Sequence, residues 1–278
     1  MRVTILGASG LLGKELVREW SGDAVNGLSS RDADIRDAKL VQEVVQKTRP
    51  DWIVLSAAYT DVDGCEAKPE LAFSVNRDGA VNVANVAEAC GARLLFLSSD
   101  YVFDGKKTTP YETDDVRNPQ SVYGRSKAEA EIKLLELIPD CCIVRTSWLF
   151  GVGGKCFPDT ILKLAASRPA LDVVNDQRGC PTYAVDLARA IIQLCRVNAK
   201  GILHATNTGD CMWFEFAEEI VKSAGLPTTV RPVSSQQMAR PAPRPAYSVL
   251  SPARLYGYGI EMPAWRDALQ RYLKQRQG

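Results

Sequence analysis

Three residues whose side chains can together transform a carbonyl group lie between positions 99 and 127. Tyr123 is followed four residues later by Lys127, and Ser99 stands upstream in the stretch SSDYVFDG. Residues four apart share one face of a helix, and an ammonium beside a phenol lowers the pKa of that phenol. The phenol can then give a proton to a developing alkoxide, while the serine hydroxyl bonds the same oxygen. We therefore predict Ser99, Tyr123 and Lys127 as catalytic residues. Because the bare Tyr-x-x-x-Lys pair is common, the surrounding elements must support it.

The N-terminal segment predicts a dinucleotide-binding turn. A short aliphatic strand, Val3–Leu6, runs directly into GASGLLG, with glycines at Gly7, Gly10 and Gly13, and an amphipathic helix continues through Trp20. Glycines between a strand and a helix allow a tight turn and a close approach of the backbone to a pyrophosphate. The helix N-terminus attracts that anion through its free N–H groups and its dipole. The G-x-x-G-x-x-G spacing is that of short-chain dehydrogenase relatives.

The end of the second expected strand, Ala24–Leu28, bears on the choice of cofactor. A ribose-binding acid is expected about 20 residues beyond the turn, but the chain has Ser29, Ser30 and Arg31 there. Arginine binds phosphate with two parallel hydrogen bonds, so this segment favours the 2′-phosphate of NADPH. Asp32 follows directly, and NADH is left open as the alternative.

Strands and helices alternate along the rest of the first half, which predicts an α/β fold with a doubly wound parallel sheet. We expect a Rossmann domain over residues 1–150, with returning segments at about 171–206, and a smaller C-terminal substrate-binding lobe over 151–278. Further strands are expected at 51–56, 93–97, 141–145, 171–174 and 201–205, and helices at 38–48, 69–90, 123–137, 157–166, 183–195 and 213–224. The strands at 171–174 and 201–205 are expected to rejoin the sheet in part.

Composition excludes several classes of function. With 34 basic and 33 acidic residues the net charge is +1, so neither nucleic acid nor an anionic membrane is expected as a partner. No run of about 18 apolar residues predicts a membrane span. The eight cysteines include no C-x-x-C pair, so we expect buried free thiols, no metal site and a cytoplasmic location. The single histidine, His204, lies in an expected strand and is interpreted as packed, which argues against Ser-His or Cys-His catalysis.

The motifs, taken in order, resemble the extended short-chain dehydrogenase/reductase (SDR) family, and within it the dTDP-4-dehydrorhamnose reductases. The resemblance covers nearly the whole chain. It implies reduction of the C4 ketone of dTDP-4-dehydro-L-rhamnose to dTDP-L-rhamnose by hydride transfer from NADPH, with a dTDP-sugar as the molecule bound and a homodimer left open. The matching segments are GASGLLG, RPDWIVLSAAYTDVDGCE, SSDYVFDG, VYGRSK, RTSWLFG, DQRGCPT and RPAYSVL.

The resemblance also implies a set of site residues by position. Ser99 stands where the family usually has threonine, and Ser29 where relatives often have an acid. Trp148 would stack on the sugar, and Arg244 is a candidate for the substrate pyrophosphate or else a solvated loop arginine. The cofactor is implied to contact Gly7, Gly10, Leu11, Leu12, Gly13, Ser29, Arg31, Asp34, Ile35, Ala57, Ala58, Tyr59, Thr60, Tyr123 and Lys127, and the substrate Ser99, Tyr101, Trp148 and Arg244.

Neighbouring activities fit less well. Nucleotide-sugar 4,6-dehydratases place Asp-Glu after the catalytic threonine, whereas Asp100 is followed by Tyr101 here, so the base for elimination is missing. A reductase acting on another nucleotide-linked 4-keto-6-deoxy sugar stays open. So does a hypothesis of a different class: the NADP-binding regulatory β subunit of methionine adenosyltransferase has a similar SSDYVFDG stretch and Tyr-x-x-x-Lys pair but serves as a partner subunit.

Overall fold

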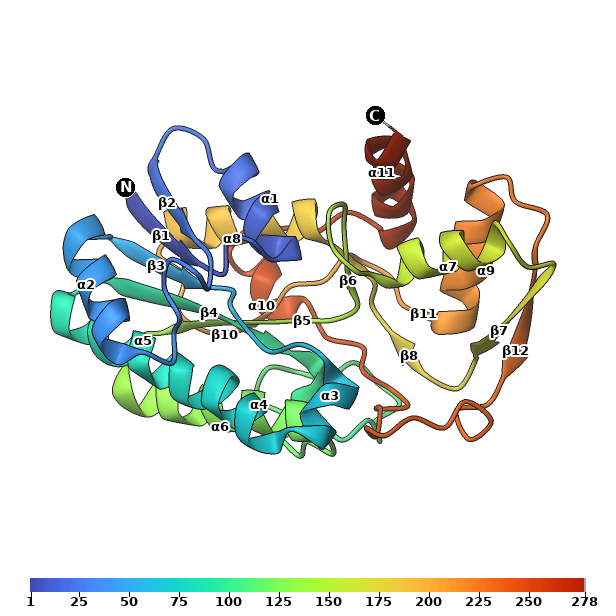
Figure 1. Cartoon of the computed structure of the whole chain (residues 1–278), viewed down its shortest axis with the longest axis horizontal. Helices are drawn as coiled ribbons and strands as arrows, with labels where there is room; N and C mark the ends of the chain where they lie inside the picture. The colour runs from blue at the N-terminus through green and yellow to red at the C-terminus, as the bar shows by residue number, and fades with distance from the viewer. Residues whose placement is uncertain (278) are drawn as a thin grey trace.

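A six-stranded parallel sheet forms the centre of the larger part of the molecule. In a computed structural model, which describes residues 1–277, the strand order is β10-β5-β4-β3-β1-β2 (Figure 1). The inner strands are continuous runs of buried aliphatic residues, as expected for strands covered on both faces. The strands are β1 (Arg2–Leu6), β2 (Ala24–Leu28), β3 (Trp52–Leu55), β4 (Arg93–Ser99), β5 (Cys142–Thr146) and β10 (Gly201–His204).

Helices cover both faces of this sheet, so the predicted doubly wound α/β fold is confirmed. One face is packed by α1 (Leu11–Glu19) and α8 (Ala184–Arg196), and the other by α2 (Ala38–Thr48), α5 (Gly79–Cys90) and α6 (Val122–Leu137). The strand order reverses between β1 and β3, which leaves a crevice at the carboxyl ends of the strands.

The helix expected over residues 69–90 is interrupted. After α3 (Val62–Ala67), the chain forms α4 (Pro69–Phe73), a π-helical turn η1 (Ser74–Asp78) and then α5. Such turns are rare and occur often at functional sites. This one carries the buried Asn76, whose side chain is used in the site described below.

A second, smaller lobe has its own apolar core. It includes α7 (Phe157–Ala165), α9 (Trp213–Ser223) and α11 (Trp265–Gln277), with β7 (Ala170–Val174) paired to β12 (Thr229–Val233). The expectation that residues 171–174 rejoin the central sheet is therefore wrong. Only one face of β7 is buried, whereas a strand inside the parallel sheet is buried on both.

Short elements connect the two parts. They are η2 (Asp100–Val102), β6 (Leu149–Phe150), β8 (Arg178–Gly179), β9 (Thr182–Tyr183), β11 (Cys211–Met212) and α10 (Ala253–Tyr256). The chain returns to the sheet through α8 and β10, and β10 pairs with β5 as the outermost strand.

Several expectations about side chains can be checked within residues 1–277. All eight cysteines are free, and only Cys90 is exposed. His204 is buried at the end of β10, and burial together with the neighbouring Arg145 lowers the pKa of its imidazole to about 3. In this part of the chain no group of three or more His, Cys, Asp or Glu side chains is placed to hold a metal ion. None of its helices has both the length and the apolar character that crossing a membrane requires.

Candidate active site

A cavity of about 650 Å³ opens at the carboxyl ends of β1, β3, β4 and β5. Its walls come from the glycine turn, the segment after β2, the loop after β3, the end of β4, the start of α6 and the segment around Trp148. Residues far apart in the chain thus meet at the edge where ligands bind in open α/β sheets.

The glycine turn is built for close backbone packing. Gly7 has φ +96°, and a Cβ there would lie 2.5 Å from the Ala57 nitrogen. A Cβ on Gly13 would lie 2.1 Å from the Gly7 carbonyl oxygen, which α1 must approach to close the turn. Helix α1 begins after Gly10 with no side-chain cap and no acid in its first turn, so its N–H groups are available to an anion. These features fit a dinucleotide pyrophosphate.

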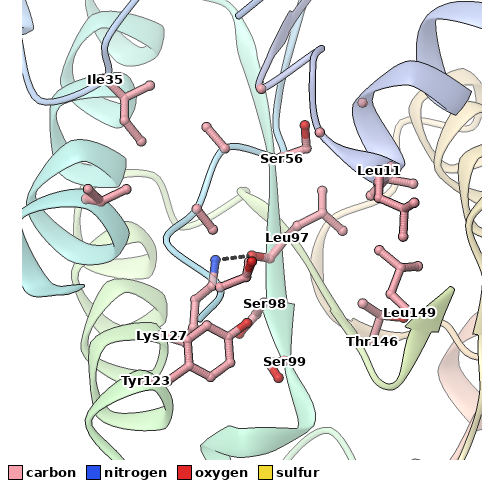
Figure 2. A pocket seen from close by; sticks show the side chains of 18 of the residues that line it. Leu11, Ile35, Ser56, Leu97, Ser98, Ser99, Tyr123, Lys127, Thr146 and Leu149 are labelled. Carbon is pink, nitrogen blue, oxygen red and sulfur yellow. Dashed lines mark hydrogen bonds between the residues drawn. The ribbon is translucent and has the colours of Figure 1, made fainter. Parts of the chain in front are cut away.

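The start of α6 is held in place by two acceptors. Ser121 caps the helix by accepting from the Gly124 N–H at 3.1 Å, and Glu66 of α3 accepts from the Val122 N–H at 2.7 Å. Gly124 allows the helix to approach η2, because a Cβ there would lie 2.2 Å from the Tyr101 carbonyl oxygen. Tyr123 is thereby placed beside Ser99, at the mouth of the cavity (Figure 2).

Tyr123 and Lys127 lie on one face of α6. Both side chains are buried, and the Lys127 Nζ donates to the carbonyl oxygen of Leu97 at 2.7 Å (Figure 2). Burial lowers the pKa of Lys127 to about 7, while Glu131 opposes this effect. Burial raises the pKa of Tyr123, and the Ser99 hydroxyl lowers it only in part. Burial is the largest influence on the phenol and the ammonium is engaged by Leu97, so a lowering of the Tyr123 pKa by Lys127 stays a prediction.

Asp100 is a buried acid that sequence reasoning did not select. It lines the cavity, and its Oδ1 accepts from the Ser99 hydroxyl at 2.9 Å. Within the described residues its Oδ2 is buried without a hydrogen-bond partner. Burial raises the pKa of Asp100 to about 6, against the hydrogen bonds from Ser248 and Ser99. Asp100 directly follows Ser99 in the SSDYVFDG stretch, and this adjacency could have marked it in the sequence as a candidate site residue.

Asn76 is a second residue that the sequence did not reveal. Its Oδ1 accepts from the Tyr59 N–H at 2.8 Å, and its Nδ2 donates to the Tyr59 carbonyl at 3.1 Å and to the Ser126 hydroxyl at 3.0 Å. It therefore joins the loop after β3 to α6. Because these partners are distant in sequence, no local pattern could have identified the role.

In the segment after β2, most polar side chains form hydrogen bonds with other residues of the same segment. The Ser29 hydroxyl and N–H both donate to Asp32 Oδ2, at 2.7 and 2.9 Å. Arg31 is exposed and does not line the cavity. Arg36 does line it, and its guanidinium donates to both Asp34 carboxylate oxygens, which lowers the pKa of Asp34. Contact of Arg31 with a 2′-phosphate stays a prediction.

Trp148 forms part of the cavity wall in a strained conformation. Its φ is +46°, in the left-handed region that bulky residues rarely adopt. The indole stacks on Trp213 with centroids 3.5 Å apart, and it also packs against Gly179, where a Cβ would lie 2.6 Å from the ring. Trp213 itself packs on the core of the smaller lobe. Stacking of Trp148 on a sugar stays a prediction.

Arg244 is not a solvated loop arginine. It donates to both carboxylate oxygens of Asp63 in α3, at 3.1 and 2.9 Å, and its side chain is 19% exposed. The pair joins the proline-rich loop of the C-terminal half to the first half of the chain, close to Tyr101, whose pKa burial raises. Arg244 does not line the cavity.

The predicted site residues thus divide into two groups. Four of them do not line the cavity: Ser29, Arg31, Tyr59 and Arg244. The cavity is lined by Gly7, Gly10, Leu11, Leu12, Gly13, Asp34, Ile35, Ala57, Ala58, Thr60, Ser99, Tyr101, Tyr123, Lys127 and Trp148. Ser30, from the segment predicted to favour NADPH, also lines the cavity. Lining residues that were not predicted include Ser9, Arg36, Asp100, Thr146, Ser147 and Lys155.

Comparison with known proteins agrees with this geometry. The family model described as the RmlD substrate binding domain matches residues 1–277. The chain belongs to the RmlD family. It is 42% identical to a dTDP-4-dehydrorhamnose reductase of Streptomyces griseus, over 96% of this chain and 91% of that protein. It is 41% identical to the spore coat polysaccharide biosynthesis protein SpsK of Bacillus subtilis, over 99% and 98%.

Among solved structures, the RmlD-family chain is similar to the dTDP-4-dehydrorhamnose reductase of Bacillus anthracis in complex with NADP. The TM-score is 0.96 at 39% identity, and 99% of each chain is covered. The resemblance inferred from the sequence motifs is therefore confirmed.

Proposed function

We propose that this RmlD-family protein is an NADPH-dependent reductase of a dTDP-linked 4-keto-6-deoxy sugar, and that its substrate is dTDP-4-dehydro-L-rhamnose, reduced at C4 to dTDP-L-rhamnose. One observation supports this most directly: the glycine turn and the Ser99–Tyr123–Lys127 set line the same cavity. Two of the relatives named above, those of Streptomyces griseus and Bacillus anthracis, are named dTDP-4-dehydrorhamnose reductase, and the second was solved with NADP.

The cofactor would be held by residues that fit its parts. The N–H groups after Gly10 would bind the pyrophosphate, Asp34 and Ile35 would lie by the adenine, and Ala58 to Thr60 by the ribose and nicotinamide. When bound, NADPH supplies the hydride that reduces a ketone. The chain supplies the proton and the oxygen-binding groups.

Tyr123 is the proton donor in this proposal. Its raised pKa keeps the phenol protonated at neutral pH, and the hydroxyl of Ser99 would bind the ketone oxygen beside it. Lys127 would hold the nicotinamide ribose. Trp148 would form an apolar wall for the sugar ring, and the smaller lobe would bind the nucleotide.

The decisive experiment measures NADPH oxidation at 340 nm with the product of a dehydratase–epimerase pair as substrate. We expect turnover with dTDP-4-dehydro-L-rhamnose, formation of dTDP-L-rhamnose and a lower rate with NADH. Turnover only with another 4-keto-6-deoxy sugar would leave the reductase assignment and change the substrate. Tight NADPH binding without turnover of any nucleotide sugar would contradict the proposal and favour the regulatory-subunit hypothesis.

A further inference from the structure

Helix α6 is docked onto β4 and the segment that follows it through three side chains one turn apart. The hydroxyl of Ser99 lowers the pKa of Tyr123 in part. Lys127 donates to the carbonyl of Leu97, and Glu131 accepts from the hydroxyl of Ser98. The first two contacts belong to the candidate catalytic set. The third lies deeper, and Glu131 is fully buried.

Every acceptor position of the Glu131 carboxylate is filled. Oε1 accepts from Ser98 Oγ and from Arg145 Nε at 2.9 Å, while Oε2 accepts from Arg145 Nη2 at 2.7 Å and from Arg117 Nε at 2.6 Å. A carboxylate offers about four lone-pair sites, so this one is satisfied. Burial would raise the pKa of Glu131, but Arg145 and Arg117 together lower it, so the group stays ionised.

The same cluster extends toward the loops on the substrate side. Arg145 also donates to the carbonyl of Thr113 at 3.1 Å, and its guanidinium lies over the Phe103 ring at 4.9 Å. Arg117 comes from the loop between η2 and α6 and is partly exposed, with 23% of its side chain accessible. Glu131 thus joins the catalytic helix to β5 and to that loop.

Lys127 has no carboxylate partner of its own. Within the described residues its ammonium makes one hydrogen bond, to Leu97 O, and lies 4.5 Å from the centre of the Phe96 ring. The negative charge that acts on it is that of Glu131, one helical turn further along the same face. Arg145 and Arg117 both donate to the Glu131 carboxylate, so the pKa of Lys127 depends on all three of these groups.

We propose that Glu131 is a positioning residue for the reduction, whose ionised carboxylate, held by Ser98, Arg145 and Arg117, places Lys127 and keeps its side chain in the ammonium form. This inference rests on the proposed function, because it assigns a use to the charge on Lys127. It gives a catalytic consequence to a cluster whose charged members, Glu131, Arg145 and Arg117, do not line the cavity.

Other titratable groups lie on α6 and on the elements near it, and among the described residues only Glu131 is a charge that acts directly on Lys127. Glu66 and Cys65 lie on α3, and Arg77 of η1 pairs with Asp78 and with Glu129 on the outer side of α6. These groups include Tyr123, Glu129 and Glu131 of α6, Asp100 of η2, Arg145 of β5, Arg117 of the loop before α6, His204 of β10, Cys65 and Glu66 of α3, Glu70 of α4, and Arg77 and Asp78 of η1.

The test measures NADPH affinity and sugar-dependent kcat/KM as functions of pH for Glu131→Gln. Removing a negative charge lowers the pKa of Lys127, so the alkaline fall of both quantities should move to lower pH, by about one pH unit. Arg117→Gln removes a positive charge instead, and its alkaline fall should move to higher pH. Both variants should lose thermal stability, because each breaks a buried contact.

Glu129→Gln is the matched control. It is the same chemical change on the same helix, but Glu129 pairs with Arg77 on the outer side and its side chain is 44% exposed. Its pH profiles should coincide with those of the wild type. Shifts of opposite sign in Glu131→Gln and Arg117→Gln would support the proposal, since a purely structural cluster has no reason to produce them.

Lower stability with unmoved pH profiles in both variants would overturn the proposal, as would shifts in the same direction. If Glu131→Gln does not fold, Arg117→Gln still tests the proposal. Its alkaline fall should lie at higher pH than that of Glu129→Gln, and an unmoved fall would overturn the proposal. NADPH affinity needs no sugar, so its pH profile tests the role of Glu131 even if the wild-type protein reduces no sugar nucleotide and the proposed function fails.

Discussion

At the scale of single residues, burial is the main influence on the candidate catalytic groups. Tyr123, Lys127 and Asp100 are all buried, and in each the neutral form is favoured: the pKa values of the phenol and the carboxyl are raised and that of the ammonium is lowered. A protonated phenol is the form that a proton donor needs. The pKa of Lys127, about 7, places its charge within reach of small electrostatic changes.

Tyr123→Phe removes the transferable proton and little else. We expect NADPH affinity to stay within about twofold while kcat falls by about 10²–10⁴, the range found for a lost general acid. Fluorescence titration of NADPH and steady-state assays give the two quantities. A rate close to that of the wild type would remove Tyr123 from the mechanism.

Asp100→Asn should change how stability depends on pH. The wild-type carboxyl has a pKa of about 6 in the folded protein, compared with 3.8 for an unperturbed group. The folded state therefore binds the extra proton between these values, and stability falls as the pH rises from about 4 to about 6. The variant has no carboxyl at this position and does not lose this stability. Between about pH 4 and pH 6, its free energy of unfolding relative to that of the wild type should therefore rise by about 3 kcal/mol.

Urea unfolding at several pH values measures this difference directly. An offset between Asp100→Asn and the wild type that stays constant with pH would mean that Asp100 titrates normally in the folded protein.

Trp148→Ala tests the predicted wall for the sugar. The side chain lines the cavity but lies away from the glycine turn in sequence, and it stacks on Trp213. We expect KM for the sugar nucleotide to rise at least tenfold while NADPH affinity is unchanged, because the apolar ring surface is lost. Equal losses for cofactor and sugar would indicate a general collapse of this wall.

At the scale of elements, close backbone packing positions both ends of the cavity. The β1–α1 turn depends on Gly7 and Gly13, and the start of α6 depends on Gly124 lying against Tyr101. Each contact leaves no room for a Cβ. The caps from Ser121 and Glu66 then determine where α6 begins, and hence which residues face β4.

Gly13→Ala should disrupt the turn. Its Cβ would meet the Gly7 carbonyl oxygen at 2.1 Å and Ala8 Cα at 2.7 Å, both of them backbone atoms that cannot move independently. We expect NADPH affinity to fall by about tenfold or more and the protein to lose about 1–3 kcal/mol of stability. Gly22→Ala is the comparison, since nothing lies within 4 Å of a Cβ there, although its φ of +80° carries its own strain. Unchanged NADPH binding in Gly13→Ala would show that the turn does not hold the cofactor.

At the scale of the whole molecule, the two parts are joined by contacts between residues far apart in the chain. Arg244 of the C-terminal loop pairs with Asp63, and Arg271 of α11 donates to both oxygens of Asp186 in α8 at 2.7 Å. In Figure 1 the loop that follows β12 runs back along the lower edge of the smaller lobe toward α3. These pairs connect segments of the C-terminal half to the larger part of the molecule.

Asp63→Asn weakens one of these joints without touching the cavity. We expect KM for the sugar nucleotide to rise several-fold with kcat and NADPH affinity nearly unchanged, because Arg244 and its loop lose their anchor. Asp172→Asn, which breaks an exposed pair with Arg231, is the control and should behave as the wild type. An unchanged KM in Asp63→Asn would show that the loop position does not matter for substrate binding.

The sequence by itself determined the local parts. Alternating aliphatic runs and helical patterns specified the parallel sheet, and GASGLLG specified the turn, because strand, glycine and helix preferences act over a few residues. Tyr123 and Lys127 could be paired because four residues make one helical turn. Family resemblance extended this to half of the residues that line the cavity.

Only the tertiary structure decided which partners those residues contact and how deeply they are buried. It engaged the Lys127 ammonium with the carbonyl of Leu97, placed Arg36 rather than Arg31 in the cavity, and paired β7 with β12 outside the sheet. It also brought Asn76, Asp100 and Glu131 into use. Burial, charge and strand pairing depend on neighbours that are distant along the chain, so no local pattern carries that information.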